Sequence, residues 1–157
     1  MCARARPFCF ARGPISADGL SDEGPLDPPR WVIASFDPSG AASALRSLGA
    51  SATPRSMVAT DAGVVVGGDA SGALFGASVD PPGATAAFTV GLDPALSPLW
   101  SLLSRTTTSS DVHRVAGVGT IAGAAFIGAT ARGSMQLGGV DLASLGGTDL
   151  VFAKLAP

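Results

Sequence analysis

One nine-residue pattern occurs three times in this chain of 157 residues. It reads RWVIASFDP from residue 30, AAFTVGLDP from residue 86 and DLVFAKLAP from residue 149. Repeats at intervals of roughly sixty residues are too long for helical pairs and fit small units of about four strands. The repetition therefore predicts tandem β units before any single residue is considered.

The residues within each copy alternate as a strand does. One column is apolar in every copy, whereas the opposite column is apolar at one end and small or polar at the other. Such a period of two indicates a pleated strand with one face buried and the other half covered. Asp37 and Asp93 each precede a proline, which ends the strand, and each aspartate can cap the turn. The apolar columns are Val32, Ala34 and Phe36, then Phe88, Val90 and Leu92, then Val151, Ala153 and Leu155.

A second repeated block supports the same units. VVVGGDASG at 64–72 aligns with AFIGATARG at 125–133, which places Gly67 on Gly128. A shorter apolar stretch precedes each block and is joined to it by a glycine turn, as in a β-hairpin. These stretches are SMVAT at 56–60 and HRVAGVGT at 113–120, and further candidate strands are SALRSLG at 43–49 and SPLWSLLS at 97–104.

The order of these segments predicts the domain organisation. Residues 54–104 form one complete unit, with strands at 56–60, 64–70, 85–92 and 97–103. Residues 24–53 and 105–157 are then parts of a preceding and a following unit, and residues 1–23 are either poorly ordered or the remnant of a damaged blade. The predicted fold is all-β, with antiparallel four-stranded blades in a partial β-propeller of about two to three blades. A β-sandwich is the alternative.

The motif GGTDLVFAKLAP at 146–157 resembles the bacterial β-propeller repeat, or SBBP-type, family. WVIASFDPSG at 31–40 and TDAGVVVGG at 60–68 match the family pattern in part, so the resemblance covers residues 24–157. It implies a module of a large exported or envelope protein, in the cell envelope or outside the cell. The positions expected to have structural roles in the repeat are Phe36, Asp37, Leu92, Asp93, Phe152, Lys154, Gly67 and Gly128.

Charge and composition exclude several classes of function. The formal net charge is −2 and the repeat region has no dense basic cluster, which disfavours nucleic-acid binding. No apolar run is long enough to span a bilayer, and the N-terminal MCARARPFCFARG lacks the apolar core of a signal peptide. Cys2 and Cys9 have no nearby histidine, so they do not predict a zinc site.

Three patterns suggest chemistry, and each has a simpler structural interpretation. Asp111, His113 and Ser109 or Ser110 supply the residue types of a hydrolytic triad, but a fold and not adjacency assembles a triad. GVGTIAG at 117–123 resembles a dinucleotide fingerprint, although strand-like sequence follows it. Single turn aspartates could bind calcium, but turn formation explains them more simply. These are Asp61, Asp69, Asp80, Asp93, Asp141 and Asp149.

These observations favour a non-catalytic structural or interaction module whose loops bind a protein or a glycan. The alternative is a fragment of a propeller-type enzyme, a hydrolase or a lyase, but such sites usually gather several acids, histidines or arginines. This chain has one histidine and one glutamate. No cofactor, catalytic residue or metal ligand is predicted, and exposed strand edges predict self-association.

Overall fold

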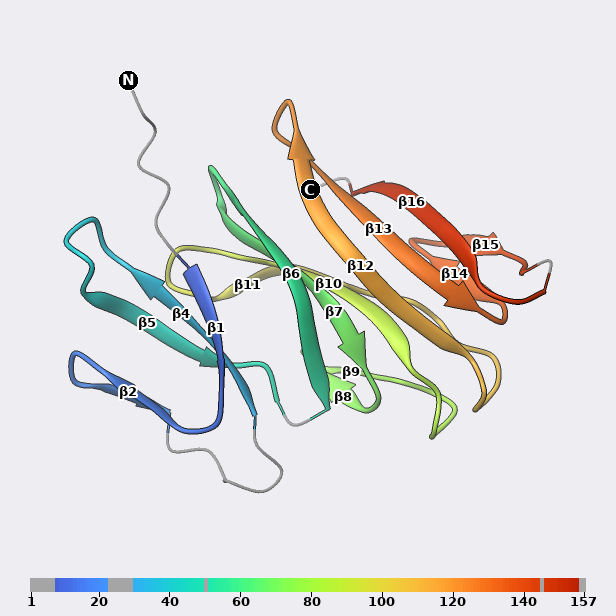
Figure 1. Ribbon diagram of the computed structural model, residues 1–157, viewed down its shortest axis with the longest axis horizontal. Helices are drawn as coiled ribbons and strands as arrows, with labels where there is room; N and C mark the ends of the chain where they lie inside the picture. Colours follow the sequence, from blue (N-terminus) through green and yellow to red (C-terminus); the bar gives the residue numbers. More distant parts are fainter. Residues whose placement is uncertain (1–7, 23–29, 50, 145, 156–157) are drawn as a thin grey trace.

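The computed structural model describes residues 8–22, 30–49, 51–144 and 146–155. These residues form strands and turns without any helix, so the predicted all-β class is confirmed. Three antiparallel sheets lie side by side along the long axis of the molecule (Figure 1). In chain order they are the first, the central and the third sheet.

The central sheet contains the four strands that the sequence predicts for the complete unit. They are β6 (Ala52–Thr60), β7 (Gly63–Ala70), β10 (Ala86–Leu92) and β11 (Pro98–Leu103). The spatial order β11-β10-β7-β6 follows the chain order, so the chain crosses the sheet from one edge to the other. β6 begins earlier than predicted because Pro54 is accommodated beside a register shift between Pro54 and Ser56, where the regular ladder is interrupted.

The flanking sheets repeat parts of this layout. The first sheet contains β1 (Phe8–Arg12), β4 (Trp31–Phe36) and β5 (Ala42–Ser47). The third contains β12 (Val112–Ile121), β13 (Ala124–Arg132) and β16 (Asp149–Leu155). The two kinds of repeated segment pair with each other in the same register in both sheets. Gly67 lies opposite Thr89 in the central sheet, and the equivalent residues Gly128 and Phe152 lie opposite each other in the third. The tandem motifs are therefore equivalent strands.

Two features of the fold differ from the sequence analysis. The poorly ordered alternative for residues 1–23 is wrong for residues 8–22, which form β1 and the hairpin of β2 (Ile15–Ala17) and β3 (Leu20–Asp22). Small hairpins that the sequence analysis missed also lie between the second and third long strands of the other two sheets. They are β8 (Ala73–Leu74) with β9 (Ala77–Ser78), and β14 (Met135–Leu137) with β15 (Val140–Leu142).

The core consists of two apolar layers, one on each face of the central sheet. Phe88, Val90 and Leu92 face the first sheet and pack with Ile33 and Leu48. On the other face Ala87 packs with residues of the third sheet that include Val115 and Ile127. β7 and β10 are consequently buried along their whole length. Each large side chain buried in this way contributes about 1.5–3 kcal/mol.

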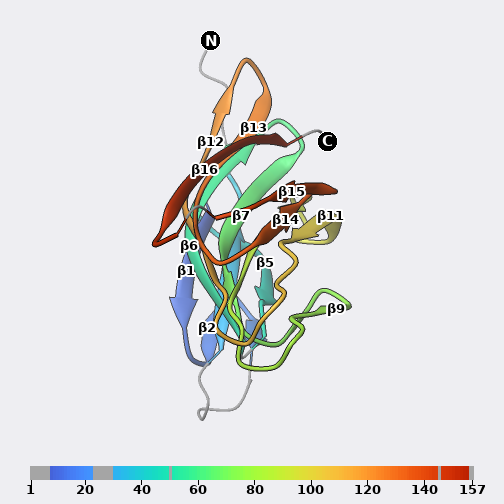
Figure 2. The same ribbon diagram turned by 90° about the vertical axis from the view of Figure 1, so that its right-hand side faces the viewer.

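The outer face of the third sheet is exposed. Leu150, Phe152 and Lys154 of β16 point away from the core, and Phe152 is 78% exposed. The equivalent column of β10 is buried because the third sheet covers it. β16 lies toward the viewer in Figure 2, at the margin of the molecule.

Candidate functional site

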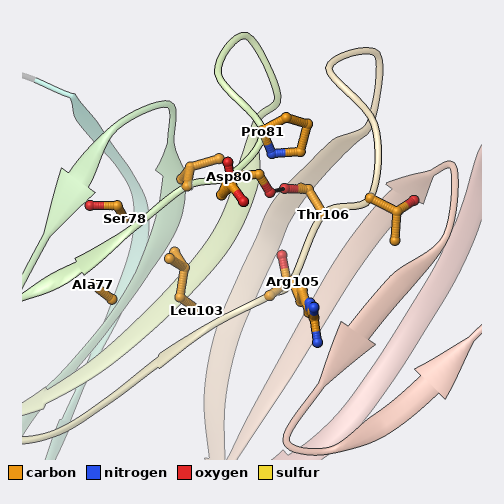
Figure 3. Close-up of a pocket in the computed structure, with 10 residues that line it drawn as sticks. Ala77, Ser78, Asp80, Pro81, Leu103, Arg105 and Thr106 are labelled. Carbon is orange, nitrogen blue, oxygen red and sulfur yellow. Dashed lines mark hydrogen bonds between the residues drawn. The ribbon is translucent and has the colours of Figure 1, made fainter.

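A cavity with several polar lining residues lies at one end of the central sheet. Its volume is about 630 Å³, and its walls come from the β8–β9 hairpin, the segment that follows the hairpin, and the segment that follows β11 (Figure 3). Leu103 and Val79 supply apolar surface. The polar lining residues are Ser78, Asp80, Ser104, Arg105, Thr106 and Thr107.

Main-chain contacts fix the position of Arg105 at this cavity. Its N–H donates to the carbonyl of Gln136 at 2.9 Å, and its carbonyl accepts from the N–H of Gln136 at 3.3 Å. The neighbouring Thr106 hydroxyl donates to the carbonyl of Asp80, which joins the two walls (Figure 3). The Arg105 side chain is exposed and forms no ion pair within the part of the chain that the structure describes. Its guanidinium is therefore available to a ligand.

A smaller cavity of about 270 Å³ lies on the other side of Arg105. Arg105 and Thr107 line both cavities, and Gln136 and Asp141 line only the second. The Gln136 side-chain amide donates to the Asp141 carboxylate at 2.8 Å. A guanidinium, two carboxylates and several hydroxyls thus lie around adjoining hollows, and groups of this kind bind the hydroxyl and charged groups of glycans and of protein loops.

The structure places His113 in a buried hydrogen-bonded cluster beside these cavities. Its Nδ1 lies 2.9 Å from Oγ of Ser104, and that oxygen accepts the N–H of Ala87 at 2.9 Å. Burial lowers the pKa of His113, and the charge of Asp111 and a hydrogen bond to the Ser134 backbone oppose this effect only in part. The ring is therefore neutral at pH 7.

Asp111 caps the turn that precedes β12. One carboxylate oxygen accepts the N–H groups of Thr107 and Thr108 at 2.6 and 2.9 Å. Both threonine hydroxyls also donate to the carboxylate. Burial alone would raise the pKa of Asp111, but these hydrogen bonds outweigh it and lower the pKa to about 2. The carboxylate is charged at every physiological pH, and its role here is to hold the turn.

The structure does not assemble the triad residues that the sequence suggested. The hydroxyl that bonds His113 belongs to Ser104, whereas Ser109 and Ser110 are exposed. Sequence reasoning missed Ser104 because nine positions separate it from His113 and it ends a candidate strand. The N–H of Ser104 bonds the carbonyl of Ala87 and the N–H of His113 bonds the carbonyl of Thr85, both at 2.8 Å, so main-chain contacts with the start of β10 bring the two side chains together.

The expected repeat positions have different environments. Asp37 accepts the N–H groups of Ser39 and Ala41, and Asp93 accepts that of Ser97 at 2.7 Å, so both aspartates cap turns. The side-chain and main-chain hydrogen bonds from Ser39 lower the pKa of Asp37. Leu92 is buried, Phe36 is half-buried, and Phe152 and Lys154 are exposed.

The remaining sequence patterns lie in ordinary strands and turns. Residues 117–123 end β12 and turn directly into β13, where a dinucleotide fingerprint would need a helix. The described residues contain no group of three His, Cys, Asp or Glu side chains that could hold a metal ion. Cys9 is exposed and unpaired, and Cys2 lies outside the described residues. No helix in the described part of the chain could cross a membrane.

Compared with known proteins, the chain matches no protein-family model and no curated protein.

Proposed function

We propose that this chain is a non-catalytic structural and interaction module, made of β-propeller-type blades of the SBBP kind, from a bacterial exported or envelope protein. Its loops at the Arg105 end bind a protein or a glycan. The complete blade comprises residues 54–104, with parts of blades in 24–53 and 105–157.

The arrangement of the strands supports the blade interpretation. The central sheet is a four-stranded antiparallel meander whose first and last strands are its two edges, as in a propeller blade. The first strand of the third sheet, β12, packs against β6 and β7 of the central sheet. β6 and β12 also carry register shifts at equivalent positions, Pro54/Ser56 and Val115/Gly117. These matching irregularities support the interpretation of the central and third sheets as repeated units.

The observation that carries the non-catalytic interpretation is the counterpart of the Ser104–His113 pair in the preceding unit. The N–H of Ser104 bonds the carbonyl of Ala87, and the N–H of Leu48 bonds the carbonyl of Trp31 in the same way, both at 2.8 Å. Leu48 therefore occupies the repeat position of Ser104, and Ala52 occupies that of His113. Leu48 and Ala52 are both buried in the core. The serine and histidine replace an apolar junction between sheets with a hydrogen-bonded one, which is a structural role.

The polar cavities beside Arg105 support loop binding. They gather hydroxyl, carboxylate and guanidinium groups on segments outside the long strands, and binding residues are disproportionately carried by such loops on a rigid scaffold. The alternative, a fragment of a hydrolase or lyase, would need an accessible nucleophile or acid and base pair. His113, the best candidate base, is wholly buried.

Binding of the purified chain to arrays of bacterial glycans and envelope-protein peptides tests this proposal. We expect Arg105→Ala to weaken binding at least about tenfold because it removes the free guanidinium. Arg12→Ala is the matched control, since it removes the same charge from an exposed position on β1. Equal losses in both variants would indicate nonspecific attraction and contradict the site. A hydrolytic or lyase activity that His113→Ala abolishes in a folded protein would overturn the non-catalytic assignment.

A further inference from the structure

We propose that the contact between Ser104 and His113 is an acid-sensitive junction that controls the connecting segment, residues 104–111, which carries Arg105. When His113 takes up a proton, this segment separates from the start of β10, and the cavities beside Arg105 lose one wall. The release follows from the chain's own contacts. Its consequence for ligand binding rests on the proposed function.

Main-chain hydrogen bonds hold both ends of the connecting segment against residues 85–87. At the first end, the N–H of Ser104 donates to the carbonyl of Ala87 at 2.8 Å, and the N–H of Ala87 donates to Oγ of Ser104 at 2.9 Å. At the other end, Thr85 donates to the carbonyl of Asp111 at 2.9 Å and accepts from the N–H of His113 at 2.8 Å. The His113 ring links the two ends, because its Nδ1 lies 2.9 Å from Oγ of Ser104.

The His113 ring lies where a positive charge is unfavourable. The residue is 0% exposed, and its Nε2 has no partner with normal hydrogen-bond geometry among the described residues, so the Ser134 backbone is a weak partner. An imidazolium donates from both ring nitrogens, and burial disfavours its charge. Burial accordingly lowers the pKa of His113. The charged ring is therefore more stable once the connecting segment opens and water reaches it.

Several charged groups surround the ring, and Asp111 is the one that acts on it. Its charge raises the pKa of His113, although burial outweighs this effect, and it stays ionised down to about pH 2. The other charged side chains on the neighbouring elements are Asp69 of β7 with its partner Arg55, Asp80 before β10, Arg105 of the connecting segment, Arg114 of β12, Arg132 of β13 and Asp149 of β16. Histidine is the side chain that ordinarily changes charge between pH 5 and 7, and this chain has one.

The preceding junction of the same chain has no group that can take up a proton. Leu48 and Ala52 occupy the repeat positions of Ser104 and His113, and both are buried and apolar. The N–H of Leu48 nevertheless makes the same main-chain hydrogen bond as that of Ser104, at the same length of 2.8 Å. The chain thus contains its own control for the effect of acid on this contact.

The direction and the limit of the effect follow from proton linkage. Because the pKa of His113 is lower in the folded than in the opened state, opening becomes easier as the pH falls below about 6.5. The uptake of one proton can favour the opened state by at most about tenfold between pH 7.5 and 5.5. We therefore expect the population of the opened segment to rise about three- to tenfold over this range.

The test is amide hydrogen exchange of the full chain, followed by NMR at pH 7.5, 6.5 and 5.5 without any ligand. The protection factor, which compares each amide with an unprotected one at the same pH, should fall about three- to tenfold at Ser104. It should fall in the same way at Arg105 and Gln136, whose main chains bond each other. At Leu48 it should change by less than about twofold.

A double variant transfers the apolar junction to the connecting segment. Ser104→Leu with His113→Ala reproduces the Leu48–Ala52 pair, and such a hydrophobic replacement at a buried site is tolerated when the total volume is kept. Protection at position 104 should then no longer depend on pH. Circular dichroism checks the fold, and the comparison of Ser104 with Leu48 in the unmodified chain decides the question if the double variant does not fold.

Three results would overturn this inference. They are equal protection of Ser104 at pH 7.5 and 5.5, an equal fall at Leu48, which would mean that the whole chain unfolds, and an unchanged pH dependence in the folded double variant. Release of the segment without binding of any glycan or peptide would contradict the proposed function alone. Binding at Arg105 with constant protection of Ser104 would contradict this inference alone.

Discussion

Asp111 offers the most direct test of the turn beside the candidate site. Its carboxylate accepts four hydrogen bonds from Thr107 and Thr108, and they hold its pKa near 2, well below the usual 3.8. A displacement of this size corresponds to about 2 kcal/mol of folding free energy. Asp111→Asn removes the charge and brings amide protons to a place where donors already converge. We expect the free energy of unfolding at pH 7 to fall by about 2 kcal/mol.

The pH dependence of this loss identifies its origin. Because the pKa of Asp111 is lower in the folded than in the unfolded protein, its contribution is complete above about pH 4 and disappears as the pH falls toward 2. The gap between the parent chain and Asp111→Asn should therefore close over this range. Urea denaturation, followed by tryptophan fluorescence at a series of pH values, measures it.

Asp141→Asn is the matched control for Asp111→Asn. Asp141 is exposed and accepts one side-chain hydrogen bond, from Gln136, so its replacement should cost less than about 0.5 kcal/mol. The reasoning is refuted if Asp111→Asn costs no more than this control at pH 7. It is also refuted if the gap stays constant down to pH 2.

Two further predictions concern the packing of the sheets. Phe88→Ala should lower the free energy of unfolding by about 3–5 kcal/mol because Phe88 is 1% exposed in the core. Phe152→Ala should change this free energy by less than about 0.5 kcal/mol, because the Phe152 side chain is exposed. Equal effects of the two substitutions in urea denaturation would contradict the assigned faces. Gly67→Ala should lower the free energy of unfolding by about 1–3 kcal/mol, since the new Cβ would lie 2.7 Å from Cγ1 of Val118. Gly119→Ala should not destabilise the protein, because no atom lies within 4 Å of the new Cβ. Thermal unfolding that ranks the two variants in the opposite order would show that the central and third sheets do not approach so closely at Gly67.

The sequence predicted the long strands well because their period-two alternation is a local property. All four strands of the central unit overlap the predicted segments, although β6 begins at Ala52 and not at residue 56, and the aspartates of the Asp-Pro turns cap as expected. β1 was covered only by the blade-remnant alternative, because beyond Arg12-Gly13, which resembles Arg132-Gly133, its sequence FCFAR matches neither repeated block. The small hairpins were missed because their strands have only two or three residues, too few to show a period.

The environment of a repeated position could not be predicted, because it depends on the neighbouring sheet. Ile33, Thr89 and Phe152 occupy one position of the repeat. The first two are buried because the next sheet covers them, whereas Phe152 is 78% exposed. The link between Ser104 and His113 has the same kind of origin, since strand register and not sequence distance brings their side chains together.

Two equivalent glycines show how the uncovered sheet adapts. Above Gly67, methyl groups of Val115 and Val118 from the third sheet fill the space where a side chain would be. Above Gly128 no further sheet is present in the described structure, and there the ring of Phe152 lies 3.3 Å from the corresponding point. The chain's own aromatic side chain thus takes the place that the neighbouring unit takes one sheet earlier. A further blade could approach this face as closely as the third sheet approaches Gly67 only if the Phe152 ring turned away from Gly128.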